Sequence, residues 1–257
     1  MSSAVDRLIV AFDEPELSGA LALGRQLRGL ARYAKIGSIL FTAAGPDAIA
    51  RFKALGFSIF LDLKFHDIPS TVEQSCRAAA ARGVSLMTVH ACAQPQMLEA
   101  ARTGARAGAR EAGVPRPRVL GVTVLTSVGE RQTSAITKTV VERALQARRA
   151  GLDGVVASPH EAAAIRRRIA RPFLIVCPGI RLPDSAAGDQ RRVATPAAAL
   201  ARGADLLVVG RPITQARQPR LAAQRILMEM VNSPRMLRFA KQNARGSLKT
   251  EDSGSWR

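Results

Sequence analysis

The chain repeats one pattern eight times: a short apolar run of β type is followed by an Ala-rich segment with helical periodicity. The apolar runs lack strict polar alternation, which is typical of parallel strands buried on both faces. We predict strands at 7–12, 33–36, 58–63, 86–90, 119–125, 154–157, 173–177 and 206–209. We predict helices near 18–30, 46–55, 70–82, 94–112, 138–150, 160–169, 196–202 and 212–231.

Eight strand–helix units in about 230 residues indicate a single-domain α/β fold, the (β/α)8 TIM barrel. An open doubly wound sheet is the alternative, but no glycine-rich dinucleotide fingerprint follows the first predicted strand. From about Asn232 the periodic apolar face is lost, and Pro234, Gly246 and scattered Ser, Lys and Arg follow. We therefore predict a barrel domain over 1–231 and a basic, flexible C-terminal tail over 232–257.

The chain is strongly basic, with 38 Lys and Arg against 20 Asp and Glu and a formal net charge of +18. The basic residues are scattered over predicted helix surfaces, where Arg serves as a solvated helix former. A single Trp and a single Tyr leave almost nothing for base stacking. We therefore expect no nucleic-acid function and favour a general attraction for anionic substrates.

Composition also bears on compartment and metal binding. No segment approaches about 18 unbroken apolar residues, and the N-terminus lacks a basic start before an apolar block, so we expect a cytoplasmic protein without membrane association. Cys76, Cys92 and Cys177 are odd in number and far apart, which predicts reduced, buried thiols. His90 and Cys92 are the only close pair of potential metal ligands, and two ligands do not make a site, so no metal is predicted.

Ionisable and polar groups follow most of the predicted strands. In a barrel of this type the carboxyl ends of the strands carry the active site. Ordinary surface polarity is the alternative, but charged groups at most strand ends favour a functional site. These groups are Asp13, Lys35, Asp62, Lys64, His90, Thr126, Ser158, Pro178, Arg181, Gly210 and Arg211.

The segment 62–71 is the most informative part of the chain. Strand alternation places Asp62 and Lys64 on one face, and Pro69 then forces the chain out of the strand. Asp67 therefore lies on a turn, able to point back at Lys64 or out to another chain. The pattern predicts a lysine ammonium bracketed by two carboxylates, although a structural ion pair is the alternative for this segment alone.

The last two predicted strands indicate a phosphate site. Gly210 lets backbone N–H groups approach an anion, and Arg211 adds a bidentate contact. Arg181 follows the preceding strand, and between it and Gln190 lies a loop of small residues suited to opening and closing, with a plain connection as the alternative. We predict a phosphorylated substrate.

With these motifs in place, the chain resembles the orotidine 5′-monophosphate decarboxylase family, which catalyses the last step of UMP synthesis. The block 62–71 is the most specific, and it departs from the usual pattern only at Ser70, where Asn is common. Phe12 stands where Leu is common. The motifs occur in the family's order, cover about residues 5–231, and lie at 10–13, 35–37, 62–71, 123–127, 178–181, 188–190 and 210–213.

The resemblance implies decarboxylation of orotidine 5′-monophosphate to UMP and CO₂ without a cofactor. It implies that Lys64 protonates C6 of the pyrimidine, with Asp62 and Lys35 completing the charged array. It also implies a homodimer in which Asp67 and Thr71 reach the neighbouring site. The implied substrate contacts are Asp13 and Lys35 to the ribose, Thr126 and Ser127 to the pyrimidine, and Arg181, Gln190, Gly210 and Arg211 to the phosphate, with Pro178 also in the binding set.

Two other interpretations remain open. One is a Mg²⁺-dependent enzyme of the same barrel superfamily, a 3-keto-gulonate 6-phosphate decarboxylase or hexulose-phosphate synthase, which resembles this chain through an Asp-x-Lys-x-x-Asp core. Lys35, the residues 178–181 and Gln190 argue against it. The other is a basic binding protein that uses its tail for nucleic acid. No signature of pyridoxal phosphate, thiamine or a metal cluster is visible, so no cofactor is expected.

Overall fold

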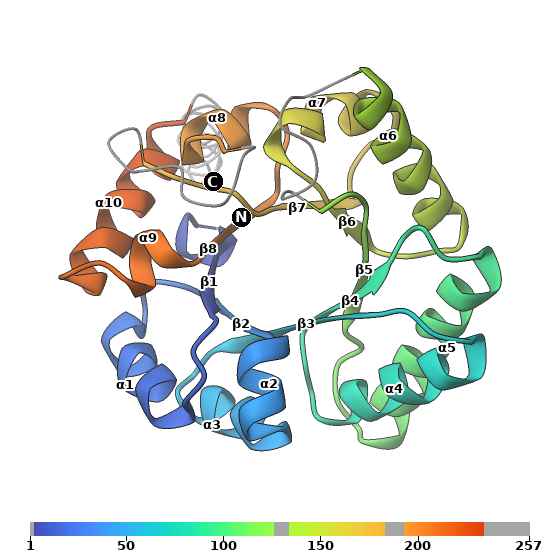
Figure 1. Cartoon of the computed structure of the whole chain (residues 1–257), viewed down its shortest axis with the longest axis horizontal. Coiled ribbons are helices and arrows are strands. Elements are labelled where there is room, and N and C mark those ends of the chain that lie inside the picture. The colour runs from blue at the N-terminus through green and yellow to red at the C-terminus, as the bar shows by residue number, and fades with distance from the viewer. Residues whose placement is uncertain (1–2, 126–133, 183–192, 234–257) are drawn as a thin grey trace, which may run out of the picture.

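Eight parallel strands pair in sequence order, and β8 pairs with β1 to close a barrel. The computed structural model describes residues 3–125, 134–182 and 193–233. Figure 1 shows the ring of strands surrounded by helices. The strands are β1 (Leu8–Phe12), β2 (Tyr33–Gly37), β3 (Ser58–Phe65), β4 (Leu86–His90), β5 (Arg118–Val122), β6 (Gly154–Val156), β7 (Leu174–Cys177) and β8 (Leu206–Val209). The predicted (β/α)8 barrel is confirmed.

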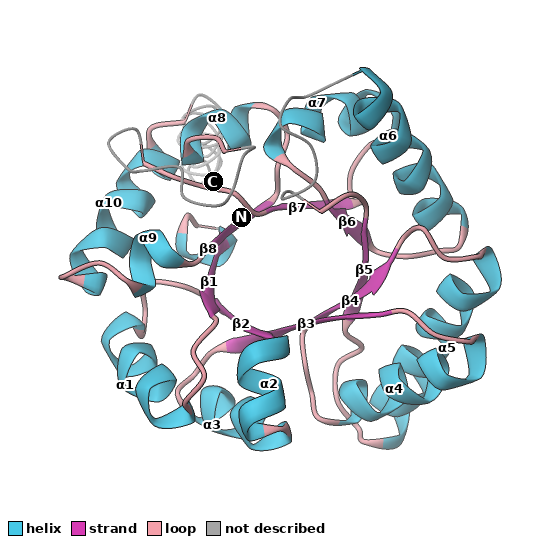
Figure 2. Cartoon of the chain, in the orientation of Figure 1, coloured by secondary structure: helices cyan, strands magenta, loops and turns pink. Residues whose placement is uncertain are grey.

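The helices alternate with the strands and lie outside the ring (Figure 2). Many begin with proline, whose fixed φ and missing N–H suit the first turn of a helix. None of the described helices is long and apolar enough to span a bilayer. They are the 3₁₀ helix η1 (Val5–Arg7), α1 (Leu17–Leu27), α2 (Ser38–Ala44), α3 (Pro46–Ala54), α4 (Pro69–Ala81), α5 (Pro95–Glu111), α6 (Ser134–Arg149), α7 (Pro159–Arg168), α8 (Pro196–Ala201), α9 (Arg211–Thr214) and α10 (Pro219–Val231).

Both faces of the strands are buried, which explains their continuous apolar runs. In β1, Leu8, Val10 and Phe12 belong to the large core between sheet and helices. Ile9 and Ala11 belong to a second cluster that fills the barrel interior with residues of the other strands. This two-sided burial is the arrangement expected of a parallel sheet covered by helices.

Several element bounds differ from the predictions. β3 continues to Phe65, whereas β5 ends at Val122, before the predicted end at 125. The short helix α2 was not predicted, because its seven residues bury little of one face and carry almost no periodic signal. The helical segment predicted at 212–231 is divided into α9 and α10, and α10 restarts at Pro219. Residues beyond Ser233 lie outside the described part, so the predicted tail stays a prediction.

One of the three cysteine predictions was wrong. Cys76 and Cys177 are buried, as predicted, but Cys92 is exposed. Cys92 lies in the connection between β4 and α5 rather than on a buried face of either element. Burial raises the pKa of the Cys76 thiol to about 12, and burial also raises that of Cys177. The thiols of Cys76 and Cys177 are therefore both protonated and unreactive at neutral pH.

Helices α4 and α5 pack with their backbones in close approach. A Cβ added at Gly104 would overlap the backbone oxygen of Glu73, and one added at Gly108 would overlap that of Arg77. Only glycine allows this separation, because a Cβ at either position would overlap a carbonyl group that is fixed in the other helix.

We predict that Gly104→Ala lowers the free energy of unfolding by about 1–3 kcal/mol, because the added methyl group forces α4 and α5 apart. Urea unfolding at fixed protein concentration measures the change. Gly19→Ala in α1 is the matched control, since nothing lies within 4 Å of its new Cβ, and there the higher helix propensity of alanine adds up to about 1 kcal/mol. Equal midpoints for the two variants would show that the close approach of α4 and α5 does not constrain stability.

Candidate active site

Charged side chains of alternating sign meet at the carboxyl ends of β1, β2 and β3. Lys35 Nζ lies 2.8 Å from Asp13 Oδ1 and 3.8 Å from Asp62 Oδ2. Lys64 Nζ lies 2.9 Å from the same oxygen of Asp62. Because Lys35 is buried and the Asp62 side chain is only 12% exposed, solvent screens these interactions weakly. The structure therefore brings together four of the predicted site residues in one charged array.

The backbone at Lys64 departs from a regular strand. Its φ is 52°, in the left-handed region that residues with a side chain rarely adopt. The pairing of β3 with β4 shifts register between Leu61 and Phe65 at the same place, which marks a bulge. Lys64 thus reaches Asp62 through this irregularity and not through simple strand alternation. Such strain costs about 1–3 kcal/mol and is characteristic of functional sites.

Thr88 in β4 links the two charged residues of β3. Its hydroxyl donates a hydrogen bond of 2.9 Å to Asp62 Oδ1 and accepts one of 2.9 Å from the backbone N–H of Lys64. Thr88 is fully buried, so both bonds are shielded from water. It was not among the predicted site residues, although a hydroxyl inside an apolar strand is the signal that points to it.

Asp62 remains charged in spite of its burial. Desolvation on its own raises the pKa of this carboxyl group. The charges of Lys35 and Lys64 and the hydrogen bonds from Lys64 and Thr88 outweigh that effect, so the pKa lies below its ordinary value. The negative charge at this position is therefore fixed near the two ammonium groups at neutral pH.

Gly37 at the end of β2 leaves room for the ion pair between Lys35 and Asp13. A Cβ at this glycine would lie 2.9 Å from both Lys35 Nζ and Asp13 Oδ1. Any larger residue would therefore displace one of the two charged groups. This steric need explains why glycine follows the lysine two positions along the chain.

Two arginines meet on the other side of the site. Arg181 is buried, and its guanidinium donates a hydrogen bond of 2.9 Å to the carbonyl of Ile180. Burial lowers the pKa of Arg181, and the nearby charge of Arg211 lowers it further. Arg211 directly follows Gly210 at the start of α9. Two guanidinium groups this close together at the edge of a cavity have the chemistry that suits an anionic group.

A cavity of about 480 Å³ joins the charged array to the two arginines. This volume is within the usual range for a small-molecule site. Glu14, Ile39, Thr214 and Gln215 also line it, and none of them was among the predicted site residues. The predicted residues that line it are Asp13, Lys35, Asp62, Lys64, Pro178, Arg181, Gly210 and Arg211.

The remaining predicted site residues are placed differently. Asp67 and Thr71 are exposed near the start of α4, and Asp67 Oδ1 accepts a hydrogen bond of 2.6 Å from the N–H of Ile68. In the described part of the chain Asp67 makes no ion pair with Lys64. Thr126, Ser127 and Gln190 lie outside the described residues.

Two further polar residues at strand ends do not line the cavity. The ring of His90 lies 5.3 Å from that of His66, and burial lowers the pKa of His90. Ser158 accepts a hydrogen bond from the backbone N–H of His160 and caps α7. Within residues 3–125, 134–182 and 193–233, no group of three or more His, Cys, Asp or Glu side chains is arranged to hold a metal ion.

Comparison with known proteins places these features in a family. The family model described as "Orotidine 5′-phosphate decarboxylase / HUMPS family" matches residues 6–226. The chain is 45% identical over 232 residues to an orotidine 5′-phosphate decarboxylase of Nostoc sp., covering 88% of this chain and 97% of that protein. It is 49% identical over 224 residues to one of Synechococcus sp., covering 84% and 92%. The crystal structure of orotidine 5′-phosphate decarboxylase from Lactobacillus acidophilus is similar at a TM-score of 0.75 and 36% identity, covering 88% of this chain and 99% of that one.

We predict that Thr88→Val raises the pKa of Asp62, because the variant loses the hydrogen bond that Thr88 donates to the carboxylate. Loss of this bond and of the bond accepted from Lys64 lowers the free energy of unfolding at pH 7 by about 2 kcal/mol. A carbon-13 NMR titration of the Asp62 carboxyl group measures the pKa directly. Thr88→Ser keeps the hydroxyl and is the matched control.

The pH dependence of stability follows from the same shift. Since the folded pKa of Asp62 is depressed, its contribution is fully present above the unfolded value of about 3.9 and is lost as pH falls through the folded pKa. The stability difference between wild type and Thr88→Val therefore narrows on acidification. A difference that stays constant with pH would show that Thr88 does not act through Asp62.

Proposed function

The chain belongs to the orotidine 5′-phosphate decarboxylase / HUMPS family, and on that premise we propose that it is a carboxy-lyase of pyrimidine biosynthesis that converts orotidine 5′-monophosphate to UMP and CO₂. The observation that carries the proposal is the alternating array of Asp13, Lys35, Asp62 and Lys64 beside a cavity that also holds two arginines. This combination supplies charge at a reacting carbon and an anchor for a phosphate.

The chemical difficulty of the reaction is an unstabilised carbanion. When CO₂ leaves C6 of the pyrimidine, the electron pair stays in the ring plane, where no π system can delocalise it. The barrier then falls through electrostatic stabilisation of that charge by groups already in position. We propose that an ammonium group in the site provides this stabilisation, and that the reaction therefore needs no cofactor.

Lys64 is the residue we propose for this role. Its Nζ lies 2.9 Å from Asp62 Oδ2, and its side chain is 35% exposed and lines the cavity. Lys64 would stabilise the developing carbanion and then donate its proton to C6, which gives UMP.

Asp62 has a different proposed role. Its carboxylate is held in place by Lys35, Lys64 and Thr88, and its negative charge faces the same cavity. A substrate carboxylate placed near it would experience repulsion that is relieved when neutral CO₂ leaves. Asp13 and Lys35 would bind the ribose hydroxyls at the adjacent wall.

Phosphate binding far from C6 is the second element of the mechanism. We propose that Arg181, Gly210 and Arg211 hold the phosphate, with Pro178 in the lining of the site. Gln190, which lies outside the described residues, is proposed as a further phosphate contact. Binding energy realised at the phosphate can be used to fix the ring against Lys64 and to exclude water. Thr126 and Ser127 are proposed to bind the pyrimidine edge.

A homodimer would complete the site. Asp67 and Thr71 are exposed, and Ile68 between them is 63% exposed, which is unusual for a large apolar residue. We propose that this part of α4 and its preceding turn packs on a second copy of the chain. Asp67 and Thr71 would then enter the neighbouring active site.

The Mg²⁺-dependent alternative within the family is less well supported. The relatives from Nostoc sp. and Synechococcus sp. are both named orotidine 5′-phosphate decarboxylases, and the match covers nearly their whole length. The fall in ultraviolet absorbance of orotidine 5′-monophosphate on adding pure protein tests the activity. Rates that are unchanged by EDTA support the cofactor-independent reaction, whereas a rate restored only by Mg²⁺ would support the alternative.

We predict that Lys64→Ala lowers kcat by more than tenfold, a loss above about 1.4 kcal/mol, while the circular dichroism spectrum is retained. The reason is that both stabilisation of the carbanion and its protonation depend on this amine. Lys53→Ala, which removes an exposed lysine that does not line the cavity, is the control. Activity above about a tenth of wild type would remove Lys64 from the mechanism.

The same variant tests the shared site. Lys64→Ala and Asp67→Ala subunits are each expected to be inactive on their own. After random exchange about half of the dimers are mixed, and one of the two sites in each mixed dimer has both native residues. Mixing should therefore restore activity to about a quarter of wild type. No recovery, together with proof of subunit exchange, would show that Asp67 acts within its own subunit.

We predict that Arg211→Ala lowers kcat/KM by a much larger factor for orotidine 5′-monophosphate than for the nucleoside orotidine, which lacks the phosphate. The reason is that the guanidinium can contact a phosphate group in the nucleotide complex but not in the nucleoside complex. Steady-state kinetics with both substrates measure the two ratios. Equal losses for nucleotide and nucleoside would refute the assignment of the phosphate site.

A further inference from the structure

A second cavity, here called the basal cavity, lies at the opposite end of the barrel from the candidate active site. Its volume is about 860 Å³. It is lined by residues at or just before the amino ends of strands: Arg7 before β1, Tyr33 in β2, Arg118 in β5, Leu174 in β7 and Leu206 in β8. Since all strands are parallel, the amino ends and the carboxyl ends form separate faces. The two cavities share no lining residue.

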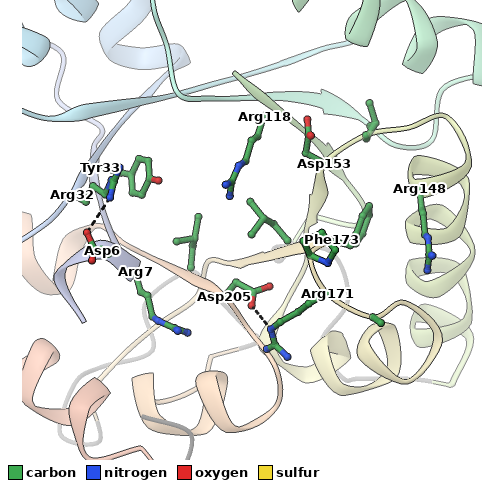
Figure 3. Close-up of a pocket in the computed structure, with 15 residues that line it drawn as sticks. Asp6, Arg7, Arg32, Tyr33, Arg118, Arg148, Asp153, Arg171, Phe173 and Asp205 are labelled. Carbon is green, nitrogen blue, oxygen red and sulfur yellow. Dashed lines mark hydrogen bonds and ion pairs between the residues drawn. The ribbon is translucent and has the colours of Figure 1, made fainter. Parts of the chain in front are cut away.

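Arginine dominates the charge of the basal cavity. Five arginines and three aspartates line it, and Figure 3 shows most of these side chains around one open space. The lining contains no lysine. Arginine presents a planar fork of donors that matches phosphate and carboxylate groups, so this composition favours an anionic ligand. The five are Arg7, Arg32, Arg118, Arg148 and Arg171.

The three aspartates each pair with at least one arginine of the chain. Asp153 pairs with Arg116, which is outside the lining, and accepts a hydrogen bond of 2.8 Å from the N–H of Val119 in β5. Asp205 accepts one of 2.9 Å from the N–H of Ile175 in β7 and pairs with two arginines.

Asp6, the third carboxylate, pairs with Arg32 at 3.1 Å. Figure 3 shows this pair and the pair of Asp205 with Arg171 at the border of the open space. The carboxylates are thus neutralised by their own arginines and do not oppose the entry of an anion.

Arg118 and Arg148 are not accounted for by these pairs. Neither side chain has a hydrogen-bond or ion-pair partner among the described residues. Both residues are exposed. Figure 3 shows the guanidinium of Arg118 directed into the open space, whereas the side chain of Arg148 lies farther out on α6, beyond Phe173. Because Arg148 is exposed, its long side chain is free to turn toward a ligand in the cavity. Two arginines beside a hollow of this size leave positive charge that the fold itself does not use.

The walls of the cavity limit the type of ligand. Tyr33 is half-buried, with the Arg32 guanidinium 5.7 Å from its ring centre, and it faces the cavity in Figure 3. Phe173 and Leu174 add apolar surface. A concave site that combines such walls with several guanidinium groups suits a compact ligand with more than one phosphate group. A nucleic-acid strand instead needs an extended basic groove with several stacking rings.

We propose that the basal cavity is a second ligand site that binds a small polyphosphorylated anion, through Arg118 and Arg148. The site is independent of the proposed decarboxylation, because no residue of the charged array contributes to it. Binding there would neutralise repulsion among the arginines and stabilise the folded chain. Either a free polyphosphate or the phosphate chain of a nucleotide fits this chemistry.

Isothermal titration calorimetry with inorganic tripolyphosphate tests the proposal. The titration uses the Arg211→Ala background, in which the candidate active site has lost one of its two phosphate-binding arginines, and is repeated with saturating UMP. We expect saturable binding that Arg118→Ala/Arg148→Ala weakens at least about tenfold, the change expected when two charge-assisted contacts are lost. Arg118→Lys/Arg148→Lys keeps the charge but loses the fork, so an intermediate affinity is expected.

The matched control is Arg106→Ala/Arg225→Ala, which removes two exposed arginines outside the cavity and is expected to leave binding unchanged. Adenosine triphosphate is titrated in parallel. If adenosine triphosphate binds more tightly than tripolyphosphate, part of the basal cavity contacts the nucleoside. If the two affinities are equal, the cavity contacts the phosphate chain alone. Decarboxylation of orotidine 5′-monophosphate should be unchanged by Arg118→Ala/Arg148→Ala in an otherwise wild-type chain.

Three results would overturn the proposal. The first is the absence of tripolyphosphate binding in the Arg211→Ala background. The second is an equal loss of affinity in the cavity variant and in the matched control, which would indicate general electrostatic attraction. The third is binding of a single-stranded RNA oligonucleotide that depends on Arg118 and Arg148 and that tripolyphosphate does not displace, which would make this face a nucleic-acid surface.

Discussion

The buried carboxylate of Asp62 is the group on which the candidate active site depends. A charge removed from water is stable in a protein only when partners and hydrogen bonds replace its hydration. Lys35, Lys64 and Thr88 provide that replacement from three different strands. Each lysine in turn is held near a carboxylate, so removal of any one member leaves an uncompensated charge. The array is thus a single electrostatic unit, and it keeps ammonium groups and a carboxylate facing one cavity.

Barrel closure is what assembles this unit. In the pairing of β1 with β2, Ala11 lies opposite Lys35, and in the pairing of β2 with β3, Gly37 lies opposite Asp62. Parallel strands in this register present their carboxyl ends to the same face, where short side chains leave room for charged ones. At the amino ends of the strands, Asp153 and Asp205 accept hydrogen bonds from backbone N–H groups of β5 and β7 and also pair with arginines. Arg118 and Arg148, which have no hydrogen-bond or ion-pair partner among the described residues, line the cavity at that end, whereas Arg181 and Arg211 line the cavity at the other.

The fold and most of the site positions were predictable from local patterns. Two-sided burial produces continuous apolar runs, and the residues that end those runs are polar because they leave the core. Asp13, Lys35, Asp62, Lys64, Arg181 and Arg211 were all found in this way, and the structure places them around one cavity. Cys92 was misjudged because low polarity does not imply burial for a residue in a connecting turn. The short helix α2 was missed because seven residues carry too little periodicity.

The order of strands and helices, the closed barrel and the identity of the charged residues at the strand ends all follow from the amino-acid sequence alone. These features depend on periodicity and side-chain chemistry within a few neighbouring residues. Three other features are visible only in the folded molecule: the left-handed backbone conformation of Lys64, the hydrogen bond from Thr88 to Asp62, and the basal cavity lined by arginines far apart in the chain. Those features depend on distances between segments separated by tens of residues, and only the packing of the closed barrel sets such distances.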